Sequence, residues 1–317
     1  MVFIKKQALL LFGLGIIILY IFTRLYNILE LPIFTDEAIY VRWAQIANND
    51  ASWRFISLTD GKQPLFVWAA MIIMRFVQDP LFAGRLVSVV AGLFSMIGLF
   101  LLGREIFKNI WIGIVSAVAY VLHPMALVYD RMALYESLLG AFTVWSLYII
   151  IILIRRIRLD VALILGMVVG GGILTKSSGF FSIYLLPLSL LLFNFKQKDK
   201  WKQLGIWAWY YVLAIIIAYG FYSILRLSPF FHIIEEKNEL FVYSFKEWQM
   251  HPFTFIHGNL RGLWDWLWRY MTFSGIILVG LSFLIDRRFF REKLMLFIWF
   301  FIPFVALTIF GKTLYPR

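Results

Sequence analysis

The sequence has 317 residues, of which 62% are hydrophobic and 15% are charged. Soluble domains average about 45–50% apolar and about 25% charged residues, so this chain has too little polar surface for a soluble globular protein. Cysteine is absent, which excludes disulfides and thiolate metal sites. The net charge of +12 lies in short basic clusters between apolar runs. This distribution is typical of membrane orientation signals, so we expect a lipid bilayer and no nucleic acid as partner.

Nine apolar segments approach or exceed the length of about 20 residues that a membrane-spanning helix requires. In chain order they are 7–29, 81–103, 110–129, 137–154, 161–175, 179–195, 204–225, 270–285 and 294–310. The first segment is too long for a signal-peptide core and lacks a small-residue cleavage site, so we expect a retained helix. The pattern predicts an all-α polytopic membrane protein, with one transmembrane domain over residues 1–317.

A tenth apolar segment, 64–77, is short and contains Arg75, and the basic connectors decide whether it crosses the membrane. Together the connectors hold 15 of the 30 Lys and Arg residues and five of the 18 acids; they are Lys5–Lys6, 103–109, 155–160, 196–202 and 286–293. If segment 64–77 does not cross, all of them lie on the side of the N-terminus. The positive-inside bias therefore predicts a cytoplasmic N-terminus, nine crossings and an interfacial helix at 64–77.

This topology places two long loops, 30–80 and 226–269, outside the cytoplasm. In the first loop, residues 36–49 carry Ile39, Trp43 and Ile46 on one stripe, which predicts a helix lying on the membrane surface. The second loop mixes acidic residues with several tryptophans. We expect a prokaryotic plasma membrane because no eukaryotic-type soluble domain is present.

Charged residues gather at the outer ends of the predicted spans, where burial is costly and usually functional. They are Asp36, Glu37, Arg42, Lys62, Arg85, Asp130, Arg131, Glu136, Lys176, Lys312 and Arg317. Carboxylates and cations at one membrane surface suit a reaction on a lipid-linked phosphate. A carboxylate removes the proton of an acceptor hydroxyl, and the cations stabilise the charge on the departing phosphate.

Each of these signals also has a structural interpretation. The adjacent acids Asp36 and Glu37 fit the start of a helix, where the helix dipole favours negative charge. Lys62 fits a lysine that extends along the interface. Glu136 could cap its helix or pair with Arg131.

The remaining polar residues in and beside the spans carry weaker signals. Lys176 could simply end its helix. His123 precedes Pro124 within a span, which favours a packed kink over a metal ligand. His251 and His257 are too far apart for a helical metal pair, so we assign no metal ligand.

The order of several short motifs is more specific than any one of them. They read FTDEAIYVRWA, GKQPLFVW, RLVSVVAG, YDRMALYESLLGAF, GGILTKSSGFFSIYLLPL and GKTLYPR. In this order they resemble the polyprenyl-phosphate-sugar-dependent glycosyltransferases of fold class C, the group of protein O-mannosyltransferases and lipid A aminoarabinose transferases. The resemblance covers essentially the whole chain and is most specific over residues 31–190.

The resemblance implies an inverting transfer of a hexose or pentose from a polyprenyl phosphate to a hydroxyl outside the cytoplasm, on a protein, glycolipid or polysaccharide. It implies that Asp36 is the general base, that Glu37 supports it, and that Glu136 orients the acceptor or binds a cation. Whether the site binds a divalent cation therefore stays open. The residues that it places near the donor phosphate are Lys62, Arg85, Arg131, Lys176, Tyr315 and Arg317.

The chain departs from this pattern in two respects. Gly61 replaces the acid that precedes the lysine in the lipid A enzymes, and Gln63 separates Lys62 from Pro64. The sequence also stops where relatives continue into further helices, so we expect a fragment or a reduced member. Two other functions stay open, a transporter or flippase and a non-catalytic lipid-binding remnant; the first usually shows repeated halves, which this sequence lacks.

Overall fold

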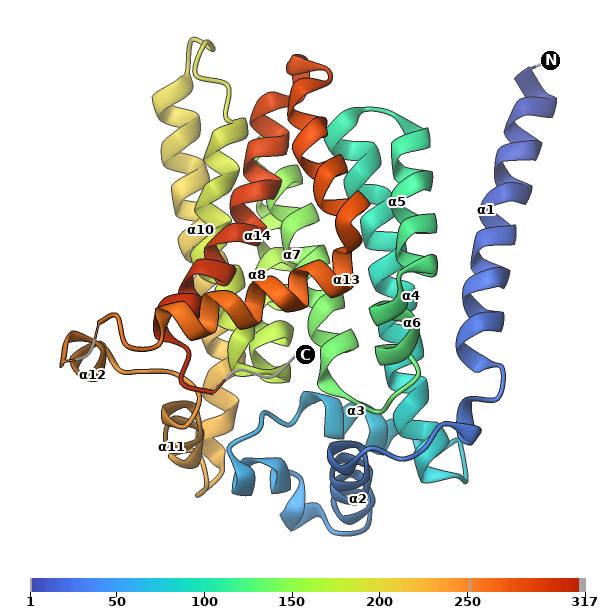
Figure 1. The fold of residues 1–317 in the computed structure, drawn as a ribbon, viewed down its shortest axis with the longest axis vertical. Coiled ribbons are helices and arrows are strands. Elements are labelled where there is room, and N and C mark those ends of the chain that lie inside the picture. The colour runs from blue at the N-terminus through green and yellow to red at the C-terminus, as the bar shows by residue number, and fades with distance from the viewer. Residues whose placement is uncertain (1, 251, 314–317) are drawn as a thin grey trace.

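The structure is a computed structural model that describes residues 2–250 and 252–313. Within these residues the regular structure is helical, apart from one isolated backbone bridge between Val242 and Gly311. Most of the helices run side by side, as Figure 1 shows. The short helices of the two long loops lie at one end of this bundle, and the N-terminus lies at the other end.

Among the described residues, five helices are long and apolar enough to cross a membrane. They are α1 (Val2–Leu25), α4 (Pro80–Phe107), α7 (Tyr135–Arg156), α10 (Lys200–Ser223) and α14 (Phe290–Phe310). Shorter apolar helices cover Ile110–Leu122, Leu159–Thr175 and Ser177–Leu192, and a bent pair covers Ile256–Phe273 and Gly275–Leu284. Each predicted apolar segment contains one of these helices. The chain is therefore a polytopic helical membrane protein, whereas the number of crossings stays a prediction.

Two predicted spans are interrupted at prolines. In the segment 110–129, α5 (Ile110–Leu122) ends before His123, whose backbone is extended, and Pro124 begins α6 (Pro124–Tyr129). A residue before proline is disfavoured in the helical conformation, so the expected kink at His123 is a complete break. In the later segment the chain stays helical at Leu186 and changes helix type at the proline.

The segment 179–195 is a short α-helix followed by a 3₁₀ helix, namely α9 (Phe180–Leu185) and η5 (Leu186–Leu192), after the turn η4 (Ser177–Gly179). Pro187 has no N–H group to donate to the carbonyl of Ile183. The hydroxyl of Tyr211 on α10 donates to that carbonyl instead, at 3.3 Å. A neighbouring helix thus satisfies the backbone group that the proline leaves free, as the interior of a membrane requires.

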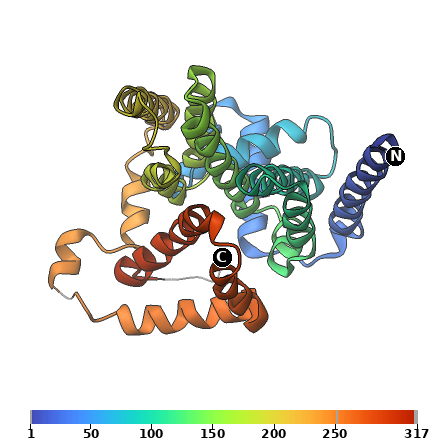
Figure 2. The same ribbon diagram turned by 90° about the horizontal axis from the view of Figure 1, so that it is seen from above.

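The second long loop is folded. It contains η6 (Ile224–Leu227), α11 (Ile233–Glu239) and α12 (Phe245–Met250), and it continues into α13 (Ile256–Leu284). Thr272 has a non-helical backbone (φ 60°, ψ 161°), and the two halves of α13 meet at 76°. The first half lies across the bundle, and the second half runs along it (Figure 1). Seen from above in Figure 2, α13 and α14 lie on one side of the molecule and α1 at its edge.

The first long loop contains η1 (Ile28–Glu30), α2 (Thr35–Asn49), η2 (Ala51–Trp53), η3 (Ile56–Asp60) and α3 (Leu65–Ile73). The nine residues of α3 span about 14 Å, far less than a bilayer core of about 30 Å, as expected of a segment that does not cross.

The predicted stripe of α2 is not the face that packs most closely on the bundle, and its contact with a membrane surface stays a prediction. Ile39 is exposed, and the fully buried face carries Tyr40, Val41, Ala44 and Ala47, which pack against α3 and α4. The two alanines and the valine let these helices approach closely. The predicted stripe was based on large apolar side chains and did not include these small residues.

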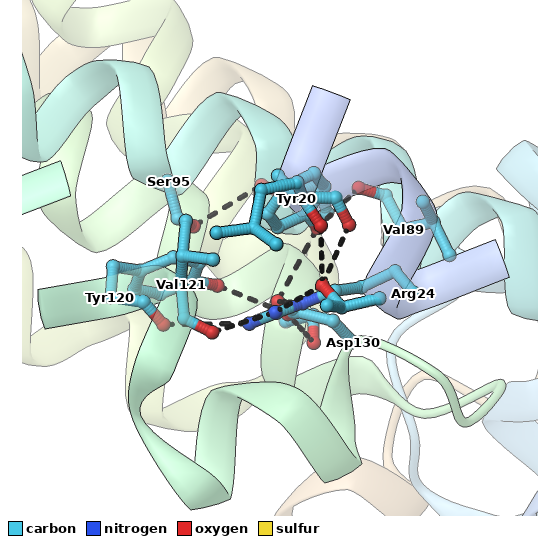
Figure 3. A network of polar contacts seen from close by, with 11 residues as sticks. Tyr20, Arg24, Val89, Ser95, Tyr120, Val121 and Asp130 are labelled. Carbon is cyan, nitrogen blue, oxygen red and sulfur yellow. Dashed lines mark hydrogen bonds and ion pairs between the residues drawn. The ribbon is translucent and has the colours of Figure 1, made fainter. Parts of the chain in front are cut away.

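A buried polar network joins α1 to the rest of the bundle (Figure 3). Arg24 is 0% exposed and Asp130 is 1% exposed, and Nε of Arg24 lies 3.5 Å from Oδ2 of Asp130. The carboxylate also accepts hydrogen bonds from the hydroxyls of Tyr20 (3.3 Å), Tyr120 (3.0 Å) and Ser137 (2.8 Å). Because these donors come from α1, α5 and α7, the network fixes three helices to the turn after α6.

The prediction from this network concerns stability. Asp130→Asn keeps the side-chain shape but leaves Arg24 buried without a counter-charge, so it should destabilise the fold by about 3–5 kcal/mol. Thermal unfolding of the detergent-solubilised protein measures this change. Asp265→Asn is the matched control, because the Asp265–Arg269 pair is exposed and such pairs contribute about 0–1 kcal/mol. Equal melting temperatures for the two variants would contradict a stabilising role of the network.

Candidate active site

The polar residues singled out in the sequence lie at the end of the bundle that carries the two long loops. Asp36 and Glu37 begin α2, Lys62 follows η3, Glu136 is in the first turn of α7, and Lys176 ends α8 (Leu159–Thr175). Figure 1 shows the start of α7 beside α2 and α3. The order of the helices therefore brings residues from distant parts of the sequence to one end of the molecule.

A buried ion pair between Glu37 and Arg85 organises this end. Nε and Nη2 of Arg85 donate to the two carboxylate oxygens of Glu37 at 2.7 and 2.8 Å, and both side chains are 0% exposed. Glu37 also accepts the backbone N–H of Ala133 at 2.7 Å. Arg85 donates further to the carbonyls of Ile28 and Leu31. The pair thus holds together η1, the start of α2, α4 and the turn before α7.

This geometry fits the supporting role expected for Glu37 and favours a structural role for Arg85. The guanidinium of Arg85 is directed at Glu37 and at backbone carbonyls, and it has no surface exposed to a donor phosphate. Glu37 also accepts the N–H of Phe34 at 3.3 Å, which fixes the first turn of α2. We infer that both residues position the neighbouring Asp36 and do not touch the substrate.

Asp36 and Lys62 both contact the side chain of Tyr40, one at its hydroxyl and the other at its ring. The hydroxyl of Tyr40 donates to Oδ2 of Asp36 at 3.3 Å, and Nζ of Lys62 lies 4.8 Å from the centre of the Tyr40 ring and 5.8 Å from that of Trp43. The Tyr40 ring packs edge-on against Tyr135, with centroids 4.5 Å apart. A half-buried carboxylate and a lysine are thereby fixed close together at the start of α2.

Lys62 is also ion-paired. Its Nζ lies 3.2 Å from Oδ2 of Asp60, whose other oxygen, Oδ1, lies 2.6 Å from Nζ of Lys237 on α11. Burial opposes ionisation of Asp60, but the hydrogen bond from Lys237 and the charge of Lys62 outweigh it and hold the pKa of Asp60 below its usual value. Lys62 therefore belongs to a group of three charges, which differs from the lone interfacial lysine that its sequence also allowed.

Glu136 and Lys176 form a second pair beside this group. Nζ of Lys176 donates to Oε1 of Glu136 at 3.0 Å, and the two side chains are 42% and 16% exposed. Nε2 of the buried Gln63 donates to Oγ of Ser177 at 2.7 Å, which ties the neighbour of Lys62 to the neighbour of Lys176. The pairing of Glu136 with Arg131 that the sequence allowed is therefore wrong; its partner is Lys176.

Some of the expected phosphate contacts lie apart from this group. Nη2 of Arg131 donates to the carbonyls of Tyr26 and Asn27 at 2.7 and 3.3 Å, just beyond the end of α1. Burial together with the nearby charges of Arg85 and Arg24 lowers the pKa of Arg131. Tyr315 and Arg317 lie outside the described residues. The described part of the chain holds no group of three or more His, Cys, Asp or Glu side chains that could bind a metal ion.

The sequence missed Asp60, Gln63 and Lys237. The first two flank Lys62, so their proximity in sequence was a signal that could have been used. Lys237 lies in a mixed acidic and basic helix of the second loop, and no motif marks it.

Comparisons with known proteins agree on the family and the fold. A protein-family model described as dolichyl-phosphate-mannose-protein mannosyltransferase matches residues 61–223, just over half of the chain. The crystal structure of ArnT from Cupriavidus metallidurans in the apo state matches with a TM-score of 0.68 and 16% identity, over 98% of this chain and 56% of that chain. This chain thus spans little more than half the length of ArnT. No curated protein matches.

The matched region contains Lys62, Glu136 and Lys176, and the structural likeness extends the shared fold to 98% of the chain. The helical membrane architecture described above is the fold that class C glycosyltransferases share. The chain is an integral membrane protein with this fold, and it belongs to the dolichyl-phosphate-mannose-protein mannosyltransferase family.

Proposed function

We propose that the chain transfers a sugar from a polyprenyl-phosphate donor to a hydroxyl acceptor, at the end of the bundle formed by α2, α3 and the start of α7. The observation that carries the proposal is the arrangement of Asp36 and Lys62 around Tyr40, 3.3 and 4.8 Å from its hydroxyl and its ring centre. A proton acceptor and a phosphate-binding cation are the two groups that such a transfer needs most. Membership of a mannosyltransferase family supports this reaction class.

Asp36 is the general base of the proposed reaction. Its carboxylate takes the proton of the acceptor hydroxyl, and the hydroxyl oxygen attacks the anomeric carbon on the face opposite the phosphate. The bond between that carbon and the phosphate oxygen breaks, and the lipid phosphate leaves with the electron pair. One displacement of this kind inverts the configuration at the anomeric carbon.

Lys62 is the proposed donor contact. Its side chain is 26% exposed, so a phosphate at the membrane surface can reach its ammonium group. The negative charge on the departing phosphate grows during the reaction, and a fixed cation stabilises it more in the transition state than in the ground state.

The Glu136–Lys176 pair is the proposed acceptor side of the site. Its two groups are partly exposed and can exchange their mutual hydrogen bond for bonds to an acceptor. We keep a hexose or pentose as the sugar and a protein, glycolipid or polysaccharide as the acceptor. The basic connectors favour an extracytoplasmic site.

The first prediction concerns the base. Asp36→Asn should lower the rate of transfer by about 10²- to 10⁴-fold, because the amide cannot accept the proton. The measurement is sugar transfer from lipid extract in membranes that contain the chain. Asp50→Asn is the control: Asp50 is exposed at the other end of α2, and asparagine can keep its cap to Ser52. Full turnover in Asp36→Asn would rule out this residue as the base.

The second prediction concerns the donor phosphate. Lys62→Met keeps the apolar stem beside Tyr40 and removes the charge, so kcat/KM for the donor should fall by about 10²- to 10³-fold. Arg42→Met removes a positive charge from the exposed face of the same loop and should change kcat/KM little. If the two variants behave alike, Lys62 contributes only to the general surface charge.

The same assays separate the other two functions. Movement of a lipid-linked sugar across the bilayer without a glycan product would favour a transporter. Folded variants of Asp36, Lys62 and Glu136 that change neither binding nor transfer would favour a non-catalytic lipid-binding protein.

A further inference from the structure

The two long loops meet at a single carboxylate. Asp60 ends η3 in the first loop, and Lys237 lies on α11 in the second loop. Nζ of Lys237 lies 2.6 Å from Oδ1 of Asp60, and Nζ of Lys62 lies 3.2 Å from Oδ2. Each lysine thus binds a different oxygen of one carboxylate, and the three groups carry a net charge of +1.

The backbone around Gly61 is shaped for this meeting. Gly61 has a φ of +65°, a conformation that side chains rarely adopt. A Cβ at this position would lie 2.5 Å from Cβ of Lys237 and 2.7 Å from the carbonyl oxygen of Ile233. Below this contact, Ile234 of α11 and Leu58 of η3 are buried in one apolar cluster. α11 is therefore packed directly on the turn that carries Lys62.

We infer that Lys237 is a positioning residue for binding of the donor phosphate. Lys237 holds the Asp60 carboxylate, so that the positive charge of Lys62 stays available to the phosphate. The inference rests on the proposed donor contact of Lys62. Without Lys237, Asp60 and Lys62 form a neutral pair. An arriving phosphate must then compete with the Asp60 carboxylate for the positive charge of Lys62. With Lys237 in place, the phosphate meets a site of net positive charge.

The partial exposure of the three side chains fits an exchange of partners. Lys62 and Lys237 are each 26% exposed and Asp60 is 38% exposed, and ion pairs open to solvent are weak. A phosphate can therefore replace Asp60 at Lys62, while Asp60 keeps its shorter contact to Lys237. The ring of Tyr40 holds the ammonium group of Lys62 in place during the exchange.

The test measures binding of decaprenyl phosphate, and of uncharged decaprenol as the reference, to the full chain in nanodiscs. Lys237→Met should weaken binding of decaprenyl phosphate about tenfold, which corresponds to about 1.4 kcal/mol, and leave binding of decaprenol unchanged. Asp60→Asn combined with Lys237→Met should return the affinity to within about threefold of wild type, because Lys62 alone again gives a net charge of +1. Lys237→Arg should retain the affinity.

Lys246→Met is the matched control, since Lys246 is an exposed lysine of the same loop on α12. It should bind like wild type, and gel filtration and melting temperature establish that each variant is folded. Wild-type affinity in folded Lys237→Met, or a double variant as weak as Lys237→Met, would overturn the inference. If Lys62→Met then still loses affinity, the proposed donor contact survives. A wild-type chain that binds the phosphate and the alcohol equally would instead overturn the donor contact itself.

Discussion

The end of the bundle that carries the candidate site depends on one buried ion pair, Glu37 with Arg85. Two charges with no exposed surface are costly to remove from water, and they are tolerated here because their hydrogen-bonding groups are matched by each other and by backbone groups. The backbone groups belong to segments that are distant in sequence. A pair of this kind adds specificity of arrangement, because a shifted loop would leave a buried charge without its partner.

Adjacent residues take opposite roles around this pair. Successive side chains on a helix point about 100° apart, so Glu37 faces the interior while Asp36 remains half-buried at the surface. A second pair of neighbours at the site differs in burial in the same way: Gln63 is buried, and Lys62 beside it is partly exposed. In both cases the buried side chain is hydrogen-bonded to another segment, and the residue beside it is partly exposed.

The sequence predicted the apolar helices and the end of the bundle at which the polar residues gather, because both follow from hydropathy and from the alternating direction of the helices. It did not predict which charges pair. For Glu136 the sequence allowed a helix cap or a pair with Arg131, five residues earlier, whereas the structure pairs it with Lys176 from the adjacent helix. Lys237 and Asp60 are 177 residues apart, and no local pattern records such a contact. Pro124 indicated a kink, where the structure has a break, whereas the change of helix type at Pro187 was not predicted. Both spans are continuous by length and hydropathy alone.

The network around Arg24 and Asp130 bears on how the protein is made. α1 leaves the ribosome long before Asp130 is synthesised, so Arg24 enters the bilayer without its partner. A lone arginine in a membrane-spanning helix is unfavourable by about 2.5–3.5 kcal/mol at the bilayer centre on insertion scales, and by less near the surface. Arg24 therefore gains its counter-charge only after Asp130 has been synthesised and has folded against the end of α1. Biogenesis of the bundle is thereby a cooperative event between its first helix and helices made much later.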